Sequence, residues 1–226
     1  MTESSKLDNP AWHSLDECHR LLATGTNEIK FYLPAICPFG GLLSPENDLS
    51  GFIQQNQQFH SFFIIGNKPE KTNGLVLLNE LVCLQMICNG PIDHKITGQI
   101  IALKEEHKEQ LVQLVNLVQP GYFLEGTVKM GDYFGIFVNG ELVAVTGERM
   151  KMKGFTEISA VVTHPEYSGK GFAKQLVAYT ANRIFQQGIL PYLHVTETNQ
   201  PAIELYKKLG FATRRKISFW KMMRAE

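Results

Sequence analysis

The segment Ile158–Ala173, ISAVVTHPEYSGKGFA, contains the most informative local signals in the chain. Its first residues are small or β-branched, which predicts a strand, and His164 followed by Pro165 ends that strand. After a short turn, Gly169 and Gly171 lead into an amphipathic helix. A strand, a glycine-rich loop and a helix N-terminus therefore follow one another within sixteen residues.

The start of this helix is a candidate anion site, and the anion we expect is a pyrophosphate. The first helical turn presents backbone N–H groups without intrahelical partners, together with the positive end of the helix dipole. Glycines allow phosphate oxygens to approach the backbone without meeting a Cβ atom. The spacing matches neither the P-loop nor the dinucleotide-binding fingerprint. An ordinary tight turn would also contain two such glycines. The segments after the loop are therefore needed to distinguish an anion site from a simple turn.

Those segments predict a helix, a strand, a second helix and a final strand. Gly171–Gln187 has apolar residues at helical spacing, and Leu190–Thr196 reads as a strand. Asn199 is placed to cap the second helix, which Gly210 ends. The chain closes with an extended run from Phe211 to Met223.

Two of these segments resemble the signature segments of the GNAT acyltransferase superfamily. They are Val162–Ala173, VTHPEYSGKGFA, and Asn199–Phe211, NQPAIELYKKLGF, and their order and separation match as well. The resemblance covers residues 99–226. Glu157-Ile-Ser-Ala, together with the extra N-terminal half, resembles the branch that includes glycine N-acyltransferase-like proteins. The resemblance implies an α+β fold of three layers, with a mixed, mostly antiparallel central sheet flanked by helices and the pyrophosphate loop after the fourth strand.

The activity implied is N-acyl transfer, most simply of an acetyl group from acetyl-CoA or another short acyl-CoA to a primary amine by direct attack in a ternary complex. In the family the strand Val161–Thr163 splays from the next one and binds the pantetheine arm through unpaired main-chain groups, which can also polarise the thioester carbonyl. At Ser168 the superfamily usually has Arg or Gln, but serine still offers the main-chain N–H. Lys170 and Lys174 could add charge at the loop or be ordinary surface lysines. The resemblance implies no metal and these cofactor-binding residues: Val161, Val162, Thr163, Ser168, Gly169, Lys170, Gly171, Phe172, Ala173 and Asn199.

Glu157 is the candidate proton acceptor for the amine. It begins the strand that meets the cofactor, and strand alternation places it on the same face as Val161. A carboxylate half-buried beside an apolar cleft would have a raised pKa and could act as a base, directly or through water. A structural glutamate, Glu148 on the preceding strand and a water chain are the alternatives. We expect His194 to be a satisfied, half-buried side chain.

Tyr206 is the candidate acid. It lies two turns into the second helix, and the resemblance places a tyrosine hydroxyl there near the cofactor sulfur, where it would protonate the leaving thiolate. The alternative is a core aromatic on a helix stripe. His164, which precedes a proline, is expected to support the turn.

The N-terminal half has no glycine-rich loop of this kind. Asn89-Gly90-Pro91 is the best boundary signal. We therefore predict a partial, degenerate GNAT-like half over residues 1–95, for which an unrelated α+β cap is the alternative, and a catalytic domain over residues 96–226. The other expected elements are a helix over Pro10–Ala23, strands over Glu28–Leu33, Gln58–Ile65, Leu75–Cys88 (facing the strand before it) and Gln99–Leu103, a helix over Lys104–Val118 and a hairpin of Tyr133–Val138 with Glu141–Arg149.

Composition narrows the class of protein. The 226 residues contain 22 Lys and Arg against 22 Asp and Glu, and no basic block gives a nucleic acid or a membrane surface an electrostatic target. The four cysteines lack metal-ligand spacing. Because Met1–Lys6 has no apolar continuation and Leu75–Cys88 is too short to span a bilayer, we expect a cytoplasmic protein. The expected partner is a small amine or amino acid, its identity and the oligomeric state left open; a non-catalytic acyl-CoA sensor or scaffold is the alternative function.

Overall fold

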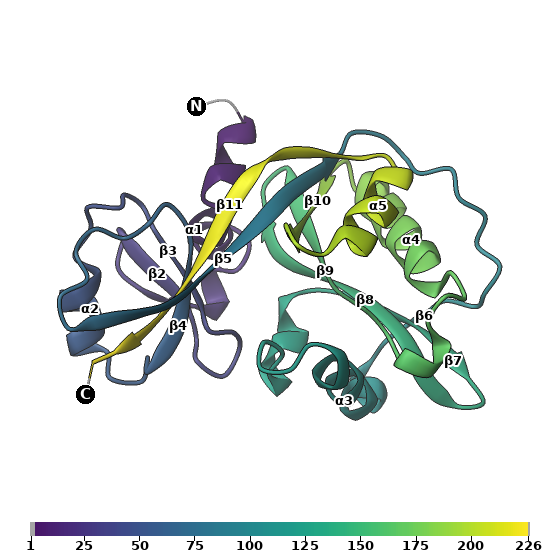
Figure 1. The fold of residues 1–226 in the computed structure, drawn as a ribbon, viewed down its shortest axis with the longest axis horizontal. Coiled ribbons are helices and arrows are strands. Elements are labelled where there is room, and N and C mark those ends of the chain that lie inside the picture. Colours follow the sequence, from purple (N-terminus) through teal and green to yellow (C-terminus); the bar gives the residue numbers. More distant parts are fainter. Residues whose placement is uncertain (1–2, 226) are drawn as a thin grey trace.

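The computed structural model describes residues 3–225, and Figure 1 traces its elements along the chain. The N-terminal half contains α1 (Pro10–Asp16), β1 (Ala23–Gly25), β2 (Ile29–Tyr32), β3 (Phe39–Leu42), α2 (Leu49–Gln55), β4 (Ser61–Gly66) and β5 (Leu75–Cys88). The C-terminal half contains β6 (Ile101–Ala102), α3 (Lys108–Val118), β7 (Tyr133–Val138), β8 (Glu141–Met152), β9 (Phe155–Thr163), α4 (Phe172–Gln186), β10 (Leu190–Thr196), α5 (Gln200–Lys208) and β11 (Phe211–Arg224). Short 3-10 helices lie at Glu3–Asp8, Arg20–Leu22, Glu105–His107, Glu125–Met130 and Pro165–Tyr167.

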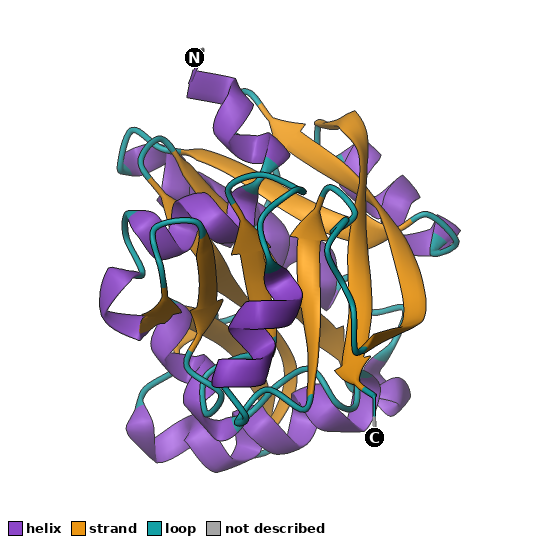
Figure 2. Ribbon diagram, turned by 90° about the vertical axis from the view of Figure 1, so that its left-hand side faces the viewer, coloured by secondary structure: helices purple, strands orange, loops and turns teal. Residues whose placement is uncertain are grey.

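One sheet runs through both halves, in the order β1-β2-β3-β4-β11-β5-β10-β9-β8-β7-β6. Its strand pairs are antiparallel except for β3 with β4 and β9 with β10, which are parallel. Figure 2 shows the long strands from the side, with helices packed around them. The predicted fold class, a mostly antiparallel mixed sheet flanked by helices, is confirmed.

The two long strands β5 and β11 join the halves, and Figure 1 shows them running side by side from one half into the other. β11 pairs with β5 along its length and with β4 through Ser218–Met223, while β5 pairs with β10 through residues 83–87. The expectation that the strands near residues 58–65 and 75–88 face each other is therefore wrong, because β11 lies between them. Residues 89–100, at the expected boundary, contain neither helix nor strand.

Helices cover both faces of the C-terminal part of the sheet (Figure 1). Val177 and Ala181 of α4 and Ile203 of α5 pack with β10 residues on one face. On the other face Leu111 and Leu114 of α3 pack against β8 and β9. These layers hold β9 between two buried clusters.

The first helix is shorter than predicted. α1 ends at Asp16, and the chain turns so that the buried His19 ring nitrogen reaches the hydroxyls of Ser14 (3.1 Å) and Tyr32 (2.9 Å). Burial lowers the pKa of His19 to about 4, so the ring stays neutral. Within residues 3–225, no helix has both the length and the apolar character that crossing a membrane requires.

Candidate active site

The site begins where β9 and β10 separate. The two strands pair in parallel only from Phe155–Leu190 to Ile158–Leu193. Beyond Ile158, β9 continues to Thr163 and β10 to Thr196 without further pairing to each other. The expected splay is confirmed, and it leaves one side of the β9 main chain without a strand neighbour.

A β-bulge at Ala160 shapes β9 at this point. The register with β8 shifts between the pairs Gly147–Ser159 and Val145–Val162, so β9 contains one extra residue. Ala160 has a φ of 51°, a left-handed conformation that costs a non-glycine residue about 1–2 kcal/mol. Because backbone strain of this kind concentrates at functional sites, the bulge favours a functional role for this part of β9.

A cavity of about 340 Å³ opens at the splay. Its walls include Ser159–Val161 of β9, His194–Thr196 of β10, Asn199 at the N-cap of α5, and Tyr206 of α5. The N-terminal half and β11 contribute three aromatic rings to the lining, namely Phe39, Phe63 and Phe219. The cavity therefore lies between the two halves, and both halves build it.

The glycine-rich loop forms a second hollow of about 660 Å³ that adjoins the cavity along β9 and α5. Gly169 and Gly171 both have a φ of 77°, and a Cβ atom at either position would meet nothing within 4 Å. Gly171 is the N-cap residue of α4, so the open N–H groups of the first helical turn face this region. Seven predicted residues line the hollow: Thr163, Ser168, Gly169, Lys170, Gly171, Phe172 and Ala173.

Two polar groups at this loop differ in what they can still bind. The N–H of Ser168 donates to the Pro165 carbonyl (3.2 Å), so the expectation that it is free for pyrophosphate is wrong. Conversely, the buried Thr163 hydroxyl has no hydrogen-bond partner among the described residues. A phosphate-bearing molecule bound at the open glycine positions would supply the hydrogen-bond partner that this hydroxyl lacks.

The remaining loop residues have clear surroundings. The Lys170 ammonium lies 4.4 Å from the centre of the Tyr167 ring, and Lys174 lines the same hollow. The Nδ1 atom of His164 accepts from the Glu166 N–H (3.3 Å), which confirms its role in the turn. The Val162 side chain is buried in the cluster against α3, so only its main chain is available to a ligand.

Glu157 lies behind the cavity wall, fully buried in an ion pair. Arg149 donates to it from Nε (2.7 Å to Oε2) and from Nη2 (2.6 Å to Oε1), and His194 Nδ1 lies 2.8 Å from Oε1. Burial raises the pKa of this carboxyl, but the charge and hydrogen bonds of Arg149, together with His194, outweigh burial and lower the pKa to about 2. The expectation of a raised pKa is therefore wrong, because the Arg149 guanidinium lies against the carboxylate where an apolar surface was expected.

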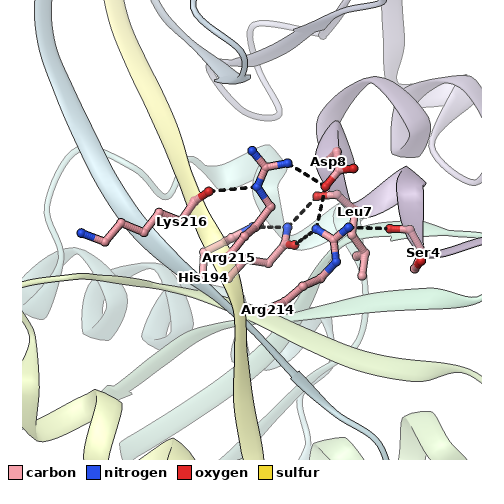
Figure 3. A network of polar contacts seen from close by, with 8 residues as sticks. Ser4, Leu7, Asp8, His194, Arg214, Arg215 and Lys216 are labelled. Carbon is pink, nitrogen blue, oxygen red and sulfur yellow. Dashed lines mark hydrogen bonds and ion pairs between the residues drawn. The ribbon is translucent and has the colours of Figure 1, made fainter.

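A chain of hydrogen bonds continues from this pair to the N-terminal 3-10 helix. Gln85 Nε2 donates to the Leu7 carbonyl (2.7 Å) and lies 3.1 Å from His194 Nε2, while Gln85 Oε1 accepts from Arg214 (2.9 Å). Figure 3 shows Arg214 and Arg215 of β11 reaching Asp8, and both hydrogen bonds end on its Oδ1 atom. Both ring nitrogens of His194 are therefore engaged, which confirms the expectation of a satisfied histidine.

Glu148 is held elsewhere. Its Oε2 atom accepts from Lys151 Nζ at 2.7 Å, and its side chain does not line the cavity.

Two predicted residues lie at the N-cap of α5 and within it. The Asn199 side chain accepts from the Ala202 N–H (3.2 Å), which confirms the predicted cap. Tyr206 lines the cavity, and burial raises the pKa of its hydroxyl, so the phenol stays protonated near neutral pH.

Sequence reasoning missed Arg149 and the aromatic wall. Arg149 and Glu157 sit on neighbouring strands on either side of the Gly154 turn, so reading the β8–β9 hairpin through to its end would have paired them. Phe39 and Phe63 are far from the site in sequence, and nothing local signals their placement. No group of three His, Cys, Asp or Glu side chains able to hold a metal is found in residues 3–225.

The sequence model of the FR47-like protein family matches residues 133–220, which include the splayed strand, the loop and α5. Among solved structures, a GNAT-family protein of Novosphingobium aromaticivorans is 28% identical, with a TM-score of 0.86 over 97% of this chain and 99% of that one. The chain has the GNAT acetyltransferase fold. A GCN5-related N-acetyltransferase from Kribbella flavida has the same fold at 13% identity, with a TM-score of 0.63 and 96% of each chain covered.

A tandem GNAT protein from the clavulanic acid biosynthesis pathway also shares the GNAT fold. Its TM-score is 0.56 at 12% identity, over 85% of this chain and 77% of that one. No curated protein sequence matches the chain at a significant level.

Proposed function

We propose that this GNAT protein is an acyl-CoA-dependent N-acyltransferase that moves an acetyl group from acetyl-CoA to a small primary amine. The observation that carries the proposal is the opening between β9 and β10, where the loop hollow and the cavity with Tyr206 adjoin. The likeness to a GNAT-family protein over 97% of this chain supports it. When bound, acetyl-CoA supplies an activated thioester.

The binding residues follow from the two hollows. The N–H groups of residues 169–173 and the unpartnered Thr163 hydroxyl would hold the pyrophosphate. The free edge of Val161–Thr163 would pair with the pantetheine amides, and Asn199, which caps α5, lies beside that path. Main-chain N–H groups at the Ala160 bulge would polarise the thioester carbonyl.

In this proposal Tyr206 donates a proton to the departing thiolate. Its hydroxyl borders the cavity and stays protonated, which is the state an acid requires. Glu157 acts as a positioning residue, since a carboxylate with a pKa of about 2 is a weak base near neutrality. It fixes Arg149 and His194 in the wall, and the amine proton leaves through water.

We further propose that residues 1–95 form the non-catalytic half and residues 96–226 the catalytic one. Phe39 and Phe63 line the cavity from the first half. In this proposal the first half therefore supplies part of the wall against which the acceptor amine binds. The relative described as a tandem GNAT protein, which shares the fold over 85% of this chain, fits this division.

The test compares thermal unfolding with and without acetyl-CoA in two matched glycine variants. At about a hundred times the Kd, a ligand stabilises the fold by about 2.7 kcal/mol, or about 5–10 °C in a chain of this length. Gly171→Ala and Gly188→Ala impose similar strain, since their φ angles are 77° and 73°, and both positions are open. Only Gly171 lines the hollow, so we expect the shift to be lost in Gly171→Ala and kept in Gly188→Ala.

Release of free CoA thiol with a panel of amines then separates catalysis from binding. Turnover supports the acyltransferase. A thermal shift without turnover of any amine would leave the alternative, an acyl-CoA sensor or scaffold. The absence of a shift with acetyl-, propionyl- and free CoA would refute both.

A further inference from the structure

The acceptor side of the cavity contains one charged side chain, and that charge is already neutralised. Of the described residues that line the cavity, Arg149 is the only Lys, Arg, Asp or Glu. Its Nε and Nη2 atoms both bond the same carboxylate, Glu157. The wall therefore has no unpaired cation for a substrate carboxylate and no unpaired anion for a second ammonium group.

The other titratable groups at the wall are neutral or engaged. Burial raises the pKa of the Cys83 thiol to about 12, and burial also raises that of Tyr206. His194 bonds Glu157 through one ring nitrogen and Gln85 through the other. A second carboxylate placed against Arg149 would lie beside Glu157 in a buried site, with one cation between two anions, which is unfavourable.

Four aromatic rings lie on the acceptor side, beside Leu81, Cys83 and Gln119. The Phe39 ring meets the rings of Phe63 (centroids 5.6 Å apart) and Phe219 (5.8 Å) edge to face. Tyr122, which is exposed, extends this wall towards solvent with its ring 5.7 Å from that of Phe63. The Arg149 guanidinium stacks 5.0 Å over the Phe39 ring. Phe39, Phe63 and Phe219 are 2%, 5% and 4% exposed, so a ligand ring would meet only those of their ring atoms that border the cavity, together with the exposed Tyr122 ring, in offset or edge-to-face geometry.

From this geometry we infer that the acceptor is an arylalkylamine: a monoamine whose body is a neutral aromatic group, lying on the Phe39–Phe63–Phe219 wall with its amine towards Ser159 and Tyr206. This inference rests on the proposed function for the direction of the amine. The same wall disfavours amino acids, because of their carboxylate, and polyamines, because of their further charges. An apolar cavity also favours the uncharged amine, which is the form that attacks a thioester.

The experiment measures binding by calorimetry in the presence of CoA, and turnover with acetyl-CoA, for four amines. 2-Phenylethylamine is the probe. n-Propylamine lacks the ring, L-phenylalanine adds a carboxylate, and spermidine adds charges. We expect 2-phenylethylamine to bind and to be acetylated at least tenfold better than each of the other three.

Two variants test the wall. Phe63→Leu keeps an apolar side chain but removes a ring from the cavity, whereas Phe59→Leu changes a buried ring of the same half that does not line it. We expect Phe63→Leu to weaken 2-phenylethylamine at least threefold without affecting n-propylamine, and Phe59→Leu to change neither.

These experiments distinguish a failure of the inference from a failure of the proposed function. If acetyl-CoA binds and L-phenylalanine or spermidine is preferred, or no amine binds, the inference is wrong while the cofactor site stands. If acetyl-CoA does not bind, the proposed function fails. Calorimetry without CoA then decides the inference, which survives only if 2-phenylethylamine binds and Phe63→Leu weakens it.

Discussion

Glu157→Gln gives the sharpest test of the buried ion pair, because it removes the charge and keeps the shape of the side chain. The fall of the Glu157 pKa from 4.5 to about 2 is equivalent to about 3 kcal/mol of stability at neutral pH. That figure agrees with the range of about 3–5 kcal/mol for breaking a buried pair. We therefore expect urea unfolding at pH 7 to show a loss of about 3 kcal/mol.

The pH dependence of this loss is fixed in sign. A lowered carboxyl pKa contributes stability that is fully present above the unfolded pKa, here about 4.5, and is lost as the pH falls towards 2. The difference between wild type and Glu157→Gln should therefore be constant from pH 7 to about pH 5 and should shrink below that.

Two controls accompany the measurement. Glu204→Gln breaks an exposed pair with Lys207 and should cost less than about 0.5 kcal/mol. Replacing both Arg149 and Glu157 by leucine should cost less than either single change, because no unpaired charge is left in the wall. A loss below about 0.5 kcal/mol for Glu157→Gln, or one that does not vary between pH 7 and pH 3, would refute the assignment of a stabilising buried pair.

Three further predictions concern the chemistry and the helix cap. Tyr206→Phe should lower kcat by roughly 10²-fold with the KM for acetyl-CoA unchanged; an unchanged kcat in steady-state assays would remove Tyr206 from the mechanism. Asn199→Ala should cost about 1 kcal/mol in urea unfolding and Asn199→Asp much less, since aspartate also caps; equal losses would argue against the cap. Because Glu157 is not the base, the pH at which kcat/KM levels off should follow the pKa of the amine used; a fixed inflection across a series of amines would reveal a base in the protein.

Much of the C-terminal half could be predicted because its signals are local. The bounds of β10, Leu190–Thr196, are those read from the sequence, Asn199 caps α5 as expected, and α4 begins one residue after the predicted start at Gly171. Glycine, proline and capping residues act within a few positions, so their effect can be read without knowing the tertiary structure.

The errors came from contacts between distant segments. β11 enters the sheet between β4 and β5, and such an order depends on strand pairing across most of the chain. The bulge at Ala160 also interrupts the alternation that placed Glu157 and Val161 on one face, and only Val161 lines the cavity. Because Arg149, which lines the cavity, bonds Glu157, the environment of this carboxylate is ionic and not apolar, and its pKa is lowered and not raised.

Because the strands β5 and β11 run through both halves, this protein is a candidate for fragment complementation. A cut within residues 89–100 would pass through a segment without helix or strand, yet it would separate β5 from both β10 and β11. Each fragment alone would then expose unpaired strand edges, which associate readily with other chains. Expressed together, the two fragments should reassemble through β5 into one folded molecule, and the cavity between the halves would form only on that reassembly.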